Sequence, residues 1–363
     1  MSSKEEQAVT QSNSCSVQGT NDHSILSKHA MCKAGYSYDP FLQSFTLKSA
    51  PRRSPLINRG YYIRDQAVQI SLHSFLKEST SDSAAKQIIS LGAGFDTSFF
   101  KLSTQSNDTL STVYYVEVDF PEVAERKRML IERSDLCRSV IDTAERFTPT
   151  HSCVKLATSQ YCLLGIDLAD VSLLAEVFSS HTKLAMELPT LLLSECVMTY
   201  MEPALSSQLI QHLHSLFPCS VFITYEQVVP GDSFGLFMQS HFTKLNSSLR
   251  GINTYPTKQA QRERYLATGY NKVDVLTMKE VYDSLSLAEK NRIWKLELFD
   301  EFEEWNLKCY HYVLVLARSD ASFTHLELLI DSFLQSSPCE LFFHLYNIIM
   351  CLLGVVISFL ILL

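Results

Sequence analysis

The sequence predicts an α/β domain built on a mostly parallel β-sheet. Short apolar runs of strand length alternate with segments whose apolar residues recur at helical spacing. The first run ends in a glycine turn, Gly92 to Gly94, and the second ends in an acid, Asp119. Strands that alternate with helices pair in parallel, because each helix returns the chain to the same end of the sheet.

The N-terminal part of the chain has two different patterns. Residues 1–27 are rich in serine, threonine, asparagine and glutamine without an apolar period, which predicts a disordered arm. Residues 28–75 have a helical pattern that three prolines interrupt. Within it, Gln66–Leu76 carries apolar residues at three-to-four spacing, so we expect an amphipathic helix there.

The apolar runs that follow predict the strands of the sheet. The first run opens the segment Lys86–Phe100 and ends at the glycine turn, and a short run also precedes Asp167. The other runs lie in Tyr114–Glu122, Thr190–Met201 and Ser220–Val228. Helical segments stand between several of them, as a parallel sheet requires.

The C-terminal third predicts a lid and two closing strands. Residues 230–291 are polar and aromatic and too long for a bare loop, so we expect helices inserted over the site. Ile293–Phe302 and Cys309–Arg318 look like closing strands. The predicted domain therefore spans 28–318, followed by a divergent tail over 319–363.

The composition indicates a folded domain with a sizeable core. Of 363 residues, 46% are hydrophobic and 19% are charged, which excludes a wholly disordered chain. The formal net charge is -8, whereas nucleic-acid binders usually carry an excess of basic residues to pair with phosphates. We therefore expect no nucleic-acid partner. The cysteines include no CxxC pair, and single cysteines without a signal peptide are typical of the cytosol.

The glycine turn is the first candidate for ligand binding. In LGAGFDT, Gly92 and Gly94 let the backbone turn sharply and approach a ligand without Cβ atoms in the way. Thr97 stands where dinucleotide motifs place a third glycine, which weakens that interpretation. An ordinary strand-to-helix turn is the alternative.

Two strand-end acids strengthen the case for a nucleoside site. Asp119 ends a strand some 25 residues after the glycines, where a carboxylate can accept hydrogen bonds from ribose hydroxyls. Asp167 ends another strand and can accept from an adenine amino group, while Leu168 can pack on the ring. A helix cap is an equal alternative for Asp167.

Glu195 lies in an apolar run that we expect to be buried in the sheet. An unpaired carboxylate there is costly, so Glu195 either meets a cation or protrudes at the strand end into the site. We favour the site.

Seven ordered segments resemble the leucine carboxyl methyltransferases, which methylate the C-terminal leucine of type 2A protein phosphatase catalytic subunits. The segments are NRGYYIR, LGAGFDT, YVEVDFP, GIDL, LLLSECVMTYM, ITYEQV and GDSFG. The resemblance covers about Lys28 to Arg318. It implies a class I S-adenosylmethionine-dependent methyltransferase fold, Rossmann-like with a mostly parallel sheet, and a helical lid.

The resemblance also implies which residues bind the cofactor, S-adenosylmethionine. The cofactor site is expected to contain Lys28, Arg64, Gly92, Asp119, Asp167, Leu168 and Glu195. Arg64 and Tyr200 are the candidate catalytic residues, although Arg64 taken alone would be a surface charge on a helix. Tyr225, Glu226, Gln227 and the GDSFG turn are further candidates for the acceptor tunnel, with half-buried core as the alternative for the tyrosines.

The expected reaction, methyl transfer to a carboxylate, needs few catalytic groups from the protein. A leucine carboxylate is already ionised at neutral pH and needs no general base. It has to lose water and lie in line with the methyl group. We therefore expect neither a Ser-His-Asp set nor a metal site. The expected partner is the phosphatase catalytic subunit.

Two other functions stay open. One is a related carboxyl methyltransferase of the tRNA wybutosine pathway, whose repeat domain has no counterpart in this sequence. The other is a membrane-tethered adaptor that keeps the fold without turnover, against which the intact charged residues argue.

The tail has a separate pattern. Leu341–Leu363 contains no charged residue and is long enough for a membrane span, which needs roughly 20 residues. A buried helix is disfavoured because no polar face exists, and an anchor has no flanking basic residues to orient it. We favour a variant ending and a cytoplasmic protein, with membrane association only if the tail is a genuine anchor.

Overall fold

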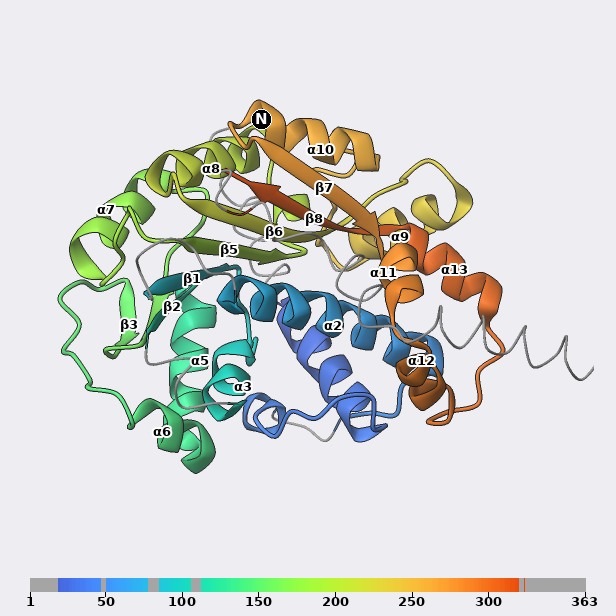
Figure 1. Cartoon of the computed structure of the whole chain (residues 1–363), viewed down its shortest axis with the longest axis horizontal. Coiled ribbons are helices and arrows are strands. Elements are labelled where there is room, and N and C mark those ends of the chain that lie inside the picture. The colour runs from blue at the N-terminus through green and yellow to red at the C-terminus, as the bar shows by residue number, and fades with distance from the viewer. Residues whose placement is uncertain (1–18, 47–49, 78–84, 106–111, 320–322, 324–363) are drawn as a thin grey trace, which may run out of the picture.

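One eight-stranded sheet with helices on both faces organises the protein (Figure 1). The computed structural model describes residues 19–46, 50–77, 85–105, 112–319 and 323. The segment 341–363, expected as a candidate membrane span, lies outside them. Among the helices of the described ranges, none has both the length and the apolar character to cross a membrane.

The strands follow the order β3-β4-β2-β1-β5-β6-β8-β7 across the sheet. Neighbours from β4 to β6 are parallel, whereas β3 and β8 run antiparallel to β4 and β6, and β7 pairs antiparallel with β8. The bounds are β1 Lys86–Leu91, β2 Val113–Asp119, β3 Val154–Ala157, β4 Tyr161–Gly165, β5 Thr190–Glu195, β6 Ser220–Gln227, β7 Lys272–Thr277 and β8 Tyr312–Arg318. The carboxyl ends of the parallel strands therefore meet at one edge, where ligands bind in such sheets.

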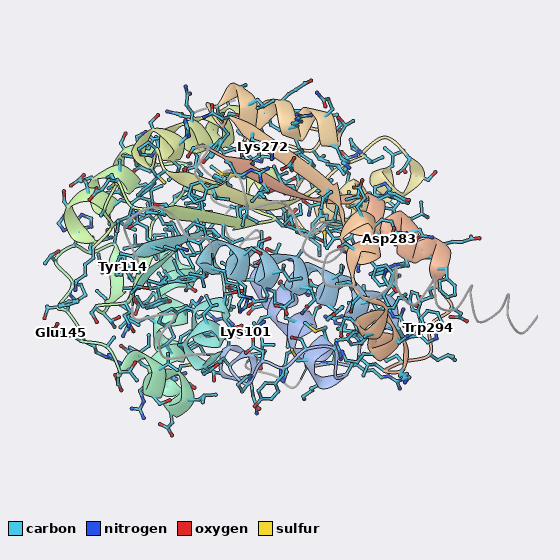
Figure 2. The ribbon with its side chains drawn as sticks, viewed as in Figure 1. Lys101, Tyr114, Glu145, Lys272, Asp283 and Trp294 are labelled. Atoms are coloured by element: carbon cyan, nitrogen blue, oxygen red, sulfur yellow. The ribbon has the colours of Figure 1, made fainter. Side chains whose placement is uncertain are left out.

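Helices cover both faces because the strands are apolar on both sides. Along β1, Ile88 packs into one core cluster with the first helix, α2, α3 and α5, while Ile89 packs into the other with α7, α8 and α10. Side chains fill the space between the ribbons (Figure 2). The helices are 19–33, η1 Leu42–Phe45, α2 Pro55–Lys77, α3 Ser98–Gln105, α5 Pro121–Arg133, α6 Asp135–Ile141, α7 Val171–His181, η2 Met198–Tyr200, α8 Pro203–Leu216, α9 Ser233–Lys244, α10 Lys258–Ala267, α11 Met278–Ser284, α12 Leu287–Trp294 and α13 Phe302–Tyr310.

The prediction of a disordered arm over residues 1–27 is wrong for residues 19–27, the part of it that the structure describes. Residues 19–33 form a helix, and Ile25 and Met31 are 3% and 1% exposed in the core. The polar composition suggested disorder because polar residues usually face solvent. In this helix some of them, such as Asn21, line a cavity instead. The amphipathic helix expected at Gln66–Leu76 is present as the second half of α2.

The lid predicted over 230–291 is shorter than expected. Of the elements in this stretch, α9 lies against the cavity described below, whereas α10 packs on the sheet and β7 is a strand of it. The segment Lys272–Thr277 was missed as a strand because it pairs with β8, which lies far along the chain.

The closing strand predicted at Ile293–Phe302 is also wrong, whereas the one at Cys309–Arg318 is present as β8. Ile293 belongs to α12, and α13 begins at Phe302. The alternating pattern between them reflects a surface segment, in which Phe299 is buried and Leu298 is 92% exposed.

A fully buried ion pair fixes helix α5 to the sheet. Lys127 on α5 lies 2.5 Å from Glu117 on β2, and neither side chain is more than 1% exposed. Tyr161 donates to the same carboxylate at 2.6 Å, and Lys127 donates to the Asp96 carbonyl at 2.7 Å. Burial raises the pKa of Glu117, with Lys127 acting in the opposite direction.

We predict that Lys127→Met destabilises the fold by about 3 to 5 kcal/mol, because it leaves Glu117 buried without a counter-ion. Urea denaturation measures this loss, and Arg133→Met, an exposed change on the same helix, should cost little. The double change Glu117→Gln with Lys127→Met should recover part of the loss. Equal stability of Lys127→Met and the wild-type chain would contradict the assigned role.

Candidate functional site

A cavity of about 730 Å³ opens at the carboxyl edge of the parallel strands. Residues from the first helix, α2, the turn after β1, the ends of β2, β4, β5 and β6, and α9 line it. Every residue expected at the cofactor site contributes to the lining, as does Tyr200. The lining residues expected from the sequence are Lys28, Arg64, Gly92, Asp119, Asp167, Leu168, Glu195 and Tyr200.

The turn after β1 requires both of its glycines. Gly92 and Gly94 have φ angles of 63° and 51°, which residues with a Cβ adopt only at a cost. A Cβ on Gly92 would lie 2.5 Å from Val197, and one on Gly94 would lie 2.5 Å from Asn21. The sequence motif thus reflects close approach of the β5 turn and the first helix.

Asp119 is held at the end of β2 by two backbone donors. Its Oδ2 accepts from the Gly94 N–H at 2.6 Å and its Oδ1 from the Phe120 N–H at 2.7 Å. Burial raises the pKa of Asp119 to about 6, and the two bonds only partly offset that effect. The carboxylate still faces the cavity, where it can accept further hydrogen bonds.

Asp167 and Leu168 follow β4 at the same edge. Leu168 is buried in the cavity wall, whereas Asp167 is exposed and accepts from the Ala169 N–H at 2.9 Å. The alternative that Asp167 caps the next helix is wrong, because Asp170 accepts from Leu173 and caps α7.

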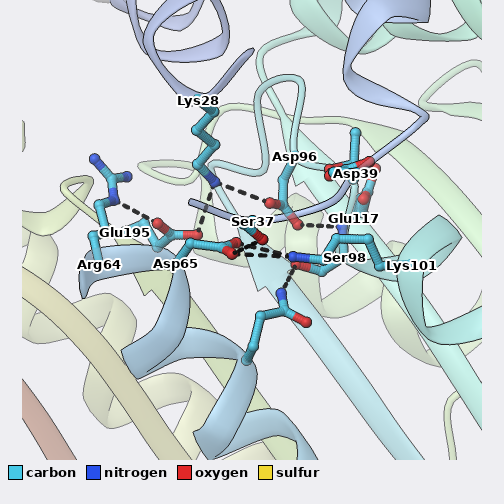
Figure 3. A network of polar contacts seen from close by, with 12 residues as sticks. Lys28, Ser37, Asp39, Arg64, Asp65, Asp96, Ser98, Lys101, Glu117 and Glu195 are labelled. Atoms are coloured by element: carbon cyan, nitrogen blue, oxygen red, sulfur yellow. Dashed lines mark hydrogen bonds and ion pairs between the residues drawn. The ribbon is translucent and has the colours of Figure 1, made fainter. Parts of the chain in front are cut away.

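Glu195 joins two cations at the centre of the site (Figure 3). Arg64 donates from Nε at 2.6 Å, and the Lys28 ammonium lies at 3.6 Å. Lys28 also pairs with Asp96 at 3.2 Å. The two alternatives for Glu195 are therefore both realised, since it protrudes at the strand end and also meets cations.

The charges in this group stabilise one another. Burial alone would lower the pKa of Lys28, but the Glu195 and Asp96 carboxylates raise it above its ordinary value. Burial would likewise raise the pKa of Asp96, yet Lys28 and Lys127 lower it. The group holds two cations and two anions, so its charges balance.

A second layer of polar contacts supports this group. Lys101 on α3 pairs with Asp65 on α2 at 3.1 Å, and Thr97 donates to Asp39 at 2.5 Å. Figure 3 shows Lys101, Asp65 and Asp39 beside the Lys28 group. They join the first helices to the turn after β1.

The other end of the cavity is aromatic. Tyr225 on β6 stacks on Tyr312 with ring centroids 5.2 Å apart, and the Arg64 guanidinium lies 4.9 Å from the Tyr225 ring. Tyr200 packs edge-on against Phe242 at 6.1 Å. Phe237 on α9 lines the mouth and is 69% exposed.

Glu226, a candidate for the acceptor tunnel, does not line the cavity. It is buried on the other side of β6 and accepts from the Met198 and Thr199 N–H groups at 3.2 and 3.1 Å. Successive residues of a strand face opposite ways, which explains why Tyr225 and Gln227 line the cavity and Glu226 does not. Glu226 instead holds the turn that carries Tyr200.

Sequence reasoning missed several lining residues. They come from the first helix, the segment before α2, the turn after β1, α9 and α13. Outside the turn, no local pattern marks them as neighbours of the glycines. Asp96 was within the LGAGFDT segment, so its charge was a usable signal. The missed residues that matter below are Asn21, Arg53, Asp96, Phe237 and Lys308.

One cluster with metal-ligating side chains lies away from the cavity. The ligand atoms of His151, Glu176 and His181 lie within 4.8 Å of one another. Nδ1 of His151 accepts the Cys153 N–H at 3.2 Å, and Nδ1 of His181 lies 2.9 Å from the Thr150 hydroxyl. Both Nδ1 atoms thus have protein partners and Glu176 is exposed, so we assign no metal to this cluster.

Comparison with known proteins places the chain in a family. The family model described as leucine carboxyl methyltransferase matches residues 25–214. The chain is 41% identical over 313 residues to tRNA wybutosine-synthesizing protein 4 of Homo sapiens and 40% over 309 residues to that of Rattus norvegicus. These matches cover 85% and 84% of this chain but only 45% and 44% of the relatives. It is 34% identical over 302 residues to leucine carboxyl methyltransferase 1 of Rattus norvegicus, which covers 83% of this chain and 89% of that relative.

A solved structure supports the fold. A DUF574-family protein from Streptomyces avermitilis superposes with a TM-score of 0.50 at 10% identity, over 82% of this chain and 97% of that chain. The expected class I S-adenosylmethionine-dependent methyltransferase fold is confirmed. The chain belongs to the leucine carboxyl methyltransferase family.

Proposed function

We propose that this protein transfers a methyl group from S-adenosylmethionine to a carboxylate and so forms a methyl ester. One observation carries the proposal: a single cavity joins an end lined by strand-end acids and balanced charges to an end lined by aromatic side chains. The first end suits the cofactor, and the second suits an acceptor.

S-adenosylmethionine is the methyl donor. We propose that Asp119 accepts from its ribose hydroxyls, that Asp167 and Leu168 contact its adenine, and that Lys28, Arg64 and Glu195 hold its methionyl end. The donor chemistry of these side chains fits those groups. When bound, the cofactor supplies a methyl group on a positively charged sulfur. Formation of the bond between a carboxylate oxygen and the methyl carbon breaks the bond between that carbon and the sulfur, so the sulfur becomes a neutral thioether.

The protein has little proton chemistry to perform. The acceptor carboxylate is ionised at neutral pH, so no residue has to remove a proton from it. The aromatic end excludes water and orients the acceptor, which strengthens its attraction to the cationic methyl donor. We propose that Tyr200 and Arg64, which both line the cavity, act where the two ends meet.

We propose a tRNA-borne carboxylate as the first candidate acceptor, in the pathway named for the wybutosine-synthesizing relatives. Two relatives from one organism give a matched comparison: identity is 40% to the rat wybutosine protein and 34% to rat leucine carboxyl methyltransferase 1 over similar spans. Because this chain spans less than half of the wybutosine relatives, their activity is a proposal here.

The second candidate is the C-terminal leucine carboxylate of a type 2A protein phosphatase catalytic subunit. Its support is the family match and the coverage of 89% of rat leucine carboxyl methyltransferase 1. The formal net charge of -8 also favours a protein over a nucleic acid.

The two acceptors are separated by one assay. The full chain is incubated with tritiated cofactor and either tRNA carrying a carboxylate-bearing wybutosine precursor or the phosphatase subunit with and without its terminal leucine. Carboxyl methyl esters release volatile methanol in alkali, which distinguishes them from other methylated products. We expect alkali-labile label on the tRNA. Label on the phosphatase alone selects the second acceptor, and cofactor binding without transfer to either indicates a non-catalytic role.

We predict that Asp119→Asn weakens cofactor binding by about 2 to 3 kcal/mol, because a charged acceptor for the ribose is lost. In the wild-type chain, affinity should fall about tenfold between pH 7 and pH 5, as Asp119 takes up a proton near its pKa of about 6. Calorimetry measures both effects, and Glu122→Gln, an exposed change nearby, is the control. A pH dependence that persists in Asp119→Asn would show that another group is responsible.

We predict that Arg64→Met abolishes transfer and leaves the chain folded. Glu195 keeps Lys28 as a cation in this variant, so its buried charge is not left alone. Transfer is measured with labelled cofactor, and folding by circular dichroism and thermal denaturation. Arg146→Met, which breaks an exposed ion pair with Asp142 and does not line the cavity, serves as the matched control. Normal turnover by Arg64→Met would remove this residue from the site.

A further inference from the structure

Lys308 is a cavity-lining cation whose charge the described protein does not balance. It lies on α13 and lines the same cavity as Lys28 and Arg64. Those two pair with Glu195 and Asp96, whereas Lys308 forms no ion pair with any residue in the described ranges. Its ammonium donates only to the Leu56 carbonyl, at a long 3.4 Å.

The Lys308 side chain packs against a glycine of α2. The Lys308 ammonium lies across Gly60, in the space that a Cβ at position 60 would take. The absence of a side chain at Gly60 therefore leaves room for the ammonium beside α2.

The electrostatics agree with this geometry. Burial lowers the pKa of Lys308 to about 8, and the nearby Cys309 and Glu301 only partly oppose that effect. Lys308 therefore keeps its proton at neutral pH but lies in surroundings that disfavour the charge. An anion that enters the cavity would supply the missing counter-ion.

We propose that Lys308 binds the carboxylate of the methyl acceptor and positions it for transfer. The inference rests on the proposed function and deepens it. Arg64 and Lys28 are already neutralised by carboxylates, so they offer less to a second anion. Arg53, which also lines the cavity, has a buried Nε without a hydrogen-bond partner and stands beside the same end of α2. The carboxylate is common to both candidate acceptors, so the role of Lys308 does not depend on its carrier.

The test compares Lys308→Met and Lys308→Arg with Lys272→Met, an exposed lysine at the start of β7 that does not line the cavity (labelled in Figure 2). The KM for the acceptor that the wild-type chain methylates should rise about 10- to 100-fold in Lys308→Met. Lys308→Arg should restore most of the affinity, and Lys272→Met should change nothing. The wild-type KM should rise above about pH 8, as Lys308 loses its proton, and this rise should be absent in Lys308→Met.

Two further measurements separate positioning from support of the fold and from failure of the proposed function. Cofactor affinity and thermal stability should be unchanged or slightly raised in Lys308→Met, because an unbalanced charge has gone. Binding of N-acetyl-L-leucine, with its uncharged methyl ester as the control probe, is measured by calorimetry in the presence of S-adenosylhomocysteine, which needs no turnover.

The outcomes divide clearly. The proposal stands if Lys308→Met weakens either acceptor KM or carboxylate-probe binding tenfold or more while Lys308→Arg retains it. If the wild-type chain methylates neither acceptor but Lys308→Met loses binding of the probe, the anion site at Lys308 stands and the proposed methyl transfer to a carboxylate is overturned. If neither quantity changes, or if the wild-type chain shows neither turnover nor probe binding, the role of Lys308 is overturned.

Discussion

The site depends on the pairing of buried charges at the carboxyl edge of the sheet. A parallel sheet places its strand ends together, and here those ends carry the acids Asp119 and Glu195. Burial of a carboxylate is costly unless a cation or several donors accompany it. Backbone N–H groups serve Asp119, and Arg64 and Lys28 serve Glu195. The first helix and α2 are therefore fixed against the sheet by the same charges that form the proposed cofactor end.

This pairing gives the two ends of the cavity different electrostatic properties. The proposed cofactor end is balanced, because the cations Lys28 and Arg64 pair with the anions Glu195 and Asp96. The stacked tyrosines and Lys308 also line the cavity, and the charge of Lys308 has no counter-ion among the described residues. A site that binds a second anion benefits from this division, because the acceptor then meets a cation that is not already satisfied.

The proposed ends of the cavity draw on different parts of the chain. The glycine turn and the strand-end acids lie within residues 25–214, which the family model matches, whereas helix α9 and Lys308 lie beyond residue 214. Tyr200 and Arg53 also line the cavity and lie within the matched range, so both parts of the chain contribute to the proposed acceptor end.

The sequence by itself determined the parallel sheet, the glycine turn and the strand-end acids. Alternating strands and helices specify the sheet, and residues at the ends of parallel strands converge whatever the intervening helices do, so Gly92, Asp119, Asp167 and Glu195 could be placed from their positions alone. Tertiary structure decided the rest. Contacts between distant segments turned residues 19–27 into a cavity-lining helix and Lys272–Thr277 into a strand, and they brought Lys308 across Gly60. Such contacts leave no local period in the sequence, because burial there is shared between elements far apart in the chain.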